Sequence, residues 1–117
     1  MKKLVSALGL SFAAVPLFAG ALAFEPVAPE GLDATAEQMV EALQAGMPAQ
    51  MAAFEAQGFG SYGAIAVPKG VELKPELLAS VANHESAEAA RIAVLDACSE
   101  LTGAECTVIG LIVPAGN

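Results

Sequence analysis

Residues 86–114 carry the sequence SAEAARIAVLDACSELTGAECTVIGLIVP, which decides the expected fold. An alanine-rich helix is predicted to begin with Ser86 as its N-cap and to end at Gly103. A short turn and a strand follow it. Each of the two elements carries one cysteine, so Cys98 and Cys106 are predicted to form a disulfide that fastens the helix to the sheet.

The strand predicted over 106–113 is apolar on both faces, so we expect it to be central in a sheet and covered by helices on both sides. Simple alternation assigns every second residue to each face. The face toward the Cys98 helix is predicted to carry Cys106, Val108, Gly110 and Ile112. The opposite face is predicted to carry Thr107, Ile109, Leu111 and Val113.

The first 23 residues have the pattern of a secretory leader. Lys2 and Lys3 precede an apolar run over 4–17, and Ala21-Leu22-Ala23 is an A-x-A cleavage box. We therefore expect a signal peptide over 1–23, a mature chain that starts at Phe24 and no stable membrane insertion after cleavage. The expected location is periplasmic or secreted, where a disulfide persists.

The chain has 117 residues, five of them basic and thirteen acidic, with a net charge of −8. Loss of the two leader lysines takes the mature chain to −10. Nucleic acid and anionic lipid require clustered Lys and Arg, so we expect neither as a partner. The remaining length suits one domain.

Before the cysteine-bearing elements, the sequence predicts an extended, mobile arm over 24–32 and a single α+β domain over 33–117. The arm is interrupted by Pro26 and Pro29. Two short helices over 34–45 and 48–57, or one helix kinked at Pro48, are expected next. Their apolar stripe consists of Ala36, Val40, Leu43, Met47, Met51 and Phe54.

Thr35 and Gln38 resemble a capping box at the start of this helical region. Strands are predicted over 61–67 and 77–83, with a brief return pairing over 71–73. The full expected order is therefore one kinked helix or a helix pair, followed by β-β-α-β. A small sheet lies between two helical layers, with one disulfide.

Several stretches resemble a family of small secreted bacterial domains of unknown function. They are Tyr62-Gly63-Ala64-Ile65-Ala66, the pair Ala89-Ala90 in a helix that reaches Cys98, and Gly103 before Cys106-Thr107-Val108. The resemblance covers about residues 61–113 and implies a fold and an exported location, but no reaction. This chain departs from the family pattern in the 68–78 loop, which is longer.

Similar short exported proteins are sometimes labelled 5-aminolevulinate synthase. Such an enzyme needs a large pyridoxal-phosphate fold with a Schiff-base lysine. A mature chain whose lysines are Lys69 and Lys74, both in one loop, does not supply one. We therefore expect no cofactor.

The expected function is that of an exported, non-catalytic binding or interaction domain for an envelope protein, a peptide or a small ligand. The candidate binding residues are Tyr62, His84, Lys69 and Lys74, because loops on a rigid scaffold commonly carry binding sites. No catalytic or metal site is expected.

The alternative is a small periplasmic hydrolase or metal-handling protein. It would use His84, the only histidine, with nearby carboxylates, or a copper site made by Met39, Met47 and Met51. A lone histidine is more often a polar turn residue, and methionines at helical spacing more often fill a core.

Overall fold

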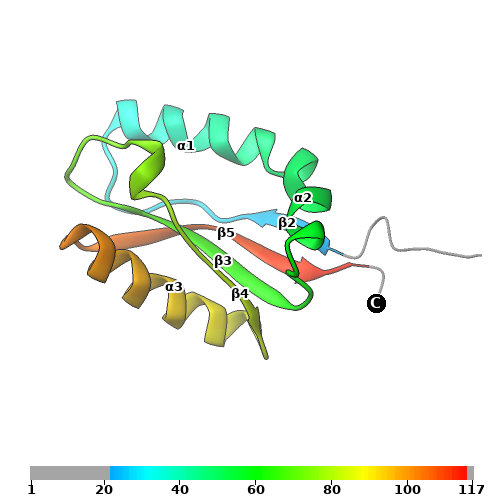
Figure 1. Ribbon diagram of the computed structural model, residues 1–117. Helices are drawn as coiled ribbons and strands as arrows, with labels where there is room; N and C mark the ends of the chain where they lie inside the picture. The colour runs from blue at the N-terminus through cyan, green and yellow to red at the C-terminus, as the bar shows by residue number, and fades with distance from the viewer. Residues whose placement is uncertain (1–21, 116–117) are drawn as a thin grey trace, which may run out of the picture.

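The computed structural model describes residues 22–115, which form a four-stranded antiparallel sheet between two helical layers (Figure 1). The α+β class, the helix–sheet–helix layering and the predicted element order are confirmed, with one additional strand at the start. The elements are β2 (Leu22–Pro26), α1 (Ala34–Gly46), the 3-10 turn η2 (Pro48–Gln50), α2 (Met51–Ala56), β3 (Tyr62–Pro68), the 3-10 turn η3 (Pro75–Leu77), β4 (Ala79–His84), α3 (Ala87–Thr102) and β5 (Cys106–Pro114).

The strand order in the sheet is β2-β5-β3-β4. The predicted central position of β5 is confirmed, because it pairs with β2 on one side and with β3 on the other. α1 and α2 cover one face of the sheet and α3 covers the other (Figure 1). Each face therefore has its own buried cluster, as expected for a strand that is apolar on both sides.

α3 begins and ends where the sequence predicts. The Ser86 hydroxyl accepts a hydrogen bond from Ala89 N at 3.0 Å, and Gly103 closes the helix with a φ of 69°. Ala90, Val94 and Cys98 form its buried face against the sheet. The predicted disulfide is present, with Cys98 and Cys106 Cα atoms 6.2 Å apart. It joins the last turns of α3 to the first residue of β5.

The predicted faces of β5 are right for its first half and wrong for its second. Val108 lies in the cluster under α3 and Ile109 in the cluster under α1, as predicted. The β3–β5 register then shifts, because Ile65 faces Gly110 whereas Ala66 faces Val108. This β-bulge interrupts the alternation. Beyond it the assignments reverse: Leu111 and Val113 pack on the α3 side, and Ile112 packs on the α1 side.

The predicted extended arm over 24–32 does not stand apart from the domain, because its residues bond to β5. Residues 24–26 belong to β2, in which Phe24 faces Ile112 across the ladder with β5. Beyond Pro26, Val27 N donates to the Ile109 carbonyl at 3.0 Å. Glu30 N donates to the Thr107 hydroxyl, also at 3.0 Å. Pro26 and Pro29 have no backbone N–H to donate, but Val27 N between them and Glu30 N after Pro29 both find acceptors on β5. The rest of the predicted leader, 1–21, lies outside the described residues.

The helical region forms two pieces, which decides between the two predicted arrangements. α1 ends before Met47, and Pro48 starts the turn η2 that leads into α2. The predicted Thr35–Gln38 capping box is wrong. Asp33 is the N-cap, and its Oδ1 accepts a hydrogen bond from Ala36 N at 2.8 Å. Most of the predicted stripe packs on the sheet, but Leu43 is 38% exposed.

The hairpin of β3 and β4 differs from the prediction in its loop. η3 occupies 75–77, so β4 begins at Ala79, and no return strand forms over 71–73 within the described residues. A second register shift lies near Asn83, which has a φ of 65°. Its side-chain amide donates to the Gly58 carbonyl at 3.1 Å and accepts from Gly60 N at 2.7 Å. Asn83 thus ties the end of β4 to the turn that follows α2.

Candidate functional site

A groove lies between α1 and the 68–78 loop, on the face of the sheet opposite α3. Its apolar part is a hollow of about 360 Å³. α1 contributes Met39, Ala42 and Leu43, β3 contributes Val67, and the far wall consists of Leu73, Lys74, Pro75 and Leu78. Figure 1 shows the loop and η3 curling up beside α1. A hollow of this size and lining suits part of a small apolar molecule.

The groove continues toward the start of α1 as a second hollow, of about 380 Å³. Met39 and Leu73 line both hollows, so they mark the boundary between them. The second hollow is more polar, because Asp33, Thr35 and Glu72 line it. The two hollows together form one groove with an apolar end and an acidic end, and we call it the α1 groove.

The exposed side chains of α1 distinguish this groove from ordinary packing. Met39 is 41% exposed and Leu43 is 38% exposed, although both project from the helix beside buried residues of the sheet. Val71, which lines the acidic end, is also exposed. Large apolar side chains gathered along one groove mark a binding surface more often than single exposed ones do.

Three residues set the conformation of the loop that forms the far wall of the groove. Gly70 has a φ of 73°, a conformation that favours glycine, and it turns the chain after β3. Leu73 is buried in the cluster under α1 and anchors the middle of the loop. Pro75 then begins η3, in which Leu77 N donates to the Lys74 carbonyl at 3.0 Å. The wall is therefore held at both ends and in its centre.

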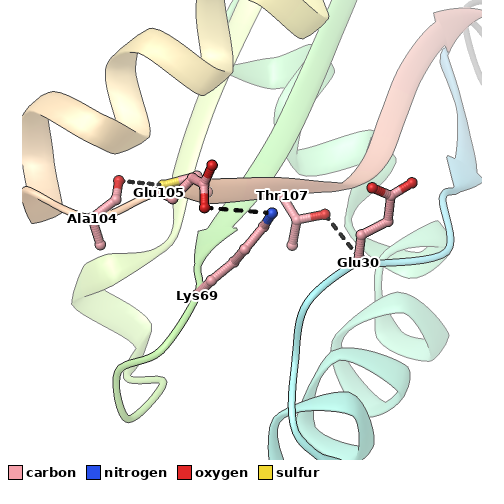
Figure 2. A network of polar contacts seen from close by, with 6 residues as sticks. Glu30, Lys69, Ala104, Glu105 and Thr107 are labelled. Carbon is pink, nitrogen blue, oxygen red and sulfur yellow. Dashed lines mark hydrogen bonds and ion pairs between the residues drawn. The ribbon is translucent and has the colours of Figure 1, made fainter.

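Of the predicted binding residues, Lys74 alone lies in the α1 groove. Lys69 lies near the start of β5, where its Nζ is 4.0 Å from a Glu105 carboxylate oxygen (Figure 2). Its backbone N also donates to the Glu105 carbonyl, at 2.7 Å. The Lys69 side chain is 26% exposed and that of Glu105 is 86% exposed, so solvent screens the pair and it adds little stability.

Tyr62 and His84 lie opposite each other in the β3–β4 ladder, at the end of the sheet away from Lys69. Tyr62 packs against the cluster under α3. In the part of the chain that the structure describes, no carboxylate or hydroxyl side chain hydrogen-bonds or ion-pairs with His84. The four predicted binding residues therefore occupy three separate places.

The three methionines of the proposed copper site also separate. Met47 and Met51 are buried in the cluster under α1 and α2, whereas Met39 lines the α1 groove. Residues 22–115 contain no group of three or more His, Cys, Asp or Glu side chains placed to hold a metal ion. No helix within those residues is long and apolar enough to cross a membrane.

Sequence reasoning missed most of the α1 groove. Its phase in the helical stripe predicts Leu43 to be in the core, and the sequence places Thr35 only in a capping box. The 68–78 loop, which is longer than in the similar family, forms the far wall of this groove. What the loop faces depends on tertiary packing, which helical periodicity does not report.

Comparisons of this chain with protein-family models, with curated proteins and with solved structures find no match. The resemblance to small secreted domains therefore stays a prediction.

Proposed function

We propose that this protein is an exported, non-catalytic binding domain whose ligand lies in the α1 groove. The observation that carries the proposal is the exposure of Met39 and Leu43 along a groove that also has a defined acidic end. The Cys98–Cys106 disulfide supports a location in an oxidising compartment such as the periplasm.

The lining of the groove favours an amphipathic ligand with an apolar body and a cationic head. The body would replace water over Met39, Leu43 and Leu78, which is favourable in proportion to the apolar area covered. The head would lie at the acidic end, beside Asp33 and Glu72. The net charge of −8, which becomes −10 without the leader lysines, attracts cations toward the whole molecule.

Lys74 lines the apolar end of the groove, and its positive charge raises the question of which way a charged ligand would bind. A ligand with a carboxylate head could bind in the reverse direction, with its head beside Lys74. Two acidic residues at one end against one lysine at the other favour the cationic head. The hydrolase alternative gains no support from His84, whose partner in the β3–β4 ladder is Tyr62.

The test is calorimetric titration of the purified, disulfide-bonded protein with octylamine, octanoate and ethylamine. Octylamine is expected to bind, octanoate to bind at least about tenfold more weakly, and ethylamine not to bind, because it has the head without the body. Stronger binding of octanoate would contradict the cationic preference. Absence of binding by both eight-carbon compounds would contradict the groove as a ligand site.

Matched variants locate the binding. Leu43→Asp places a charge in the apolar hollow and is expected to abolish octylamine binding. Ile92→Asp is the control, because Ile92 is 56% exposed on α3, on the other side of the sheet. Glu72→Gln is expected to reduce the ratio of the octylamine affinity to the octanoate affinity. Lys74→Gln is expected to increase this ratio.

A further inference from the structure

Two cleavage boxes overlap at the end of the predicted leader. Ala19-Gly20-Ala21 and Ala21-Leu22-Ala23 both have the A-x-A pattern that a signal peptidase accepts. Cleavage after Ala21 would leave Leu22 as the first residue, and cleavage after Ala23 would leave Phe24. The expected start at Phe24 follows from the second box, but the first box has the same pattern. The burial of Leu22 favours the first box.

Leu22 is part of the folded domain. It is the first residue of β2, faces Pro114 of β5, and is only 4% exposed. It belongs to the same buried cluster as Met51 of α2 and Ile112 of β5. Cleavage after Ala23 would remove this core side chain and would shorten the edge strand by two residues.

The backbone nitrogen of Leu22 already has an acidic partner. It donates to Glu55 Oε2 at 3.1 Å rather than to a carbonyl of β5. Glu55 lies on α2 and is partly buried beside the start of β2. The peptide N–H is an uncharged donor to this carboxylate, whereas a free α-ammonium group would add a full positive charge and form a salt bridge with it.

We infer that the leader is removed after Ala21 and that Leu22 is the mature N-terminus, paired with Glu55. This inference rests on the proposed export of the protein. An export signal peptidase hydrolyses the Ala21–Leu22 peptide bond with water. The water oxygen remains on the new Ala21 carboxyl group, and the Leu22 nitrogen becomes an amine that takes up a proton at neutral pH.

The test is expression of the full-length precursor in a Gram-negative bacterium, followed by N-terminal sequencing and intact-mass measurement of the periplasmic protein. The expected first residue is Leu22. A protein that begins at Phe24 would overturn the inference and leave export intact. A protein that still begins at Met1 and stays in the cytoplasm would overturn the proposed export as well.

Two substitutions separate the boxes. Ala19→Leu removes a small residue from the first box only, and Ala23→Val removes one from the second box only. Ala23→Val is expected to leave processing at Leu22 unchanged, and valine suits the strand that Ala23 occupies. Ala19→Leu is expected to stop processing or to move it to Phe24. The reverse pattern would contradict the inference.

The two mature forms should also differ in stability. The form that starts at Phe24 lacks the Leu22 side chain and the partner of Glu55, so its thermal midpoint is expected to be about 10 °C lower. Equal thermal midpoints would show that the fold does not depend on Leu22. They would remove the structural argument for cleavage after Ala21.

Discussion

The aromatic ring of Phe24 lies over the α-carbon of Gly110, in the space that a side chain at residue 110 would occupy. A Cβ atom built on Gly110 would overlap with Cε1 and Cζ of Phe24. Phe24 belongs to β2, and Gly110 lies beside the bulge of β5. The missing side chain thus lets the edge strand place an aromatic ring on the central strand.

Gly110→Ala is expected to lower the free energy of unfolding by about 2 kcal/mol, because the methyl group must displace the Phe24 ring. Urea denaturation followed by circular dichroism measures the loss. Phe24→Leu combined with Gly110→Ala should recover part of it. Gly46→Ala is the control, since a Cβ there meets nothing within 4 Å. An equal loss in both variants would contradict the contact as the cause.

Removal of the disulfide should cost stability without changing the fold. Cys98→Ala with Cys106→Ala opens a loop with a sequence separation of 8. The chain-entropy treatment gives a loss of about 2.5 kcal/mol for so short a loop. Chemical denaturation of the variant and of the reduced wild-type protein measures it, and reductant should not affect the variant. Equal stability of oxidised and reduced wild type would contradict this prediction.

Two substitutions at Asn83 separate its backbone and side-chain contributions. Asn83→Gly tolerates the φ of 65° but loses the hydrogen bonds to Gly58 and Gly60, at an expected cost of about 1 kcal/mol. Asn83→Ala loses the same bonds and adds backbone strain of about 1 kcal/mol. Ser80→Ala, at an exposed position of β4, is the control. The order of thermal midpoints checks this, and an alanine variant as stable as the glycine variant would contradict it.

Gln44→Glu should make stability depend on pH. The Gln44 side-chain amide donates to the carbonyl oxygens of Val27 and Ile109, both at 2.9 Å. A carboxylate there would face two acceptors, so its pKa in the folded state should rise above the unfolded value of about 4.3. With a raised folded-state pKa, the stability of the variant is closest to that of wild type at pH values below the unfolded-state pKa. The variant then loses stability as pH rises through the folded-state pKa.

We expect Gln44→Glu to be about 2 kcal/mol less stable than wild type at neutral pH. Unfolding curves at pH values on both sides of the glutamate pKa measure the difference. Gln44→Ala should show a smaller loss that does not vary with pH. Gln38→Glu, at an exposed position of α1, should show no loss. A deficit for Gln44→Glu that shrinks as pH rises would contradict the assignment.

The elements with strong local signals were predictable from sequence. Ser86 and Gly103 mark the ends of α3 by capping chemistry that acts within one helical turn. The two apolar faces of β5 predicted a central strand. Because the chain has two cysteines, one in each of two neighbouring elements, a disulfide between them was also predictable. These features depend on contacts between residues close in sequence or on chain composition.

The features that failed depend on contacts between distant segments. The bulge opposite Ile65 reverses the faces of Leu111 and Ile112, and alternation alone carries no sign of it. β2 was missed because its first residues were assigned to the leader. The α1 groove was missed because periodicity reports which side of a helix is apolar, but not whether the layer below is wide enough to cover Leu43.

The order of the strands in the sheet differs from the order in which the ribosome makes them. β5 is made after β2, β3 and β4, yet β2 and β3 both pair with it, and within residues 22–115 β2 pairs with no other strand. A nascent chain that has reached only His84 can therefore form the β3–β4 hairpin, but it has no partner for β2. The sheet cannot be completed before the final strand is made, because β2 and β3 both pair with this strand and both lie far from it in sequence. Under the export that we propose, this delay would leave the sheet incomplete until the last strand of the chain has been made.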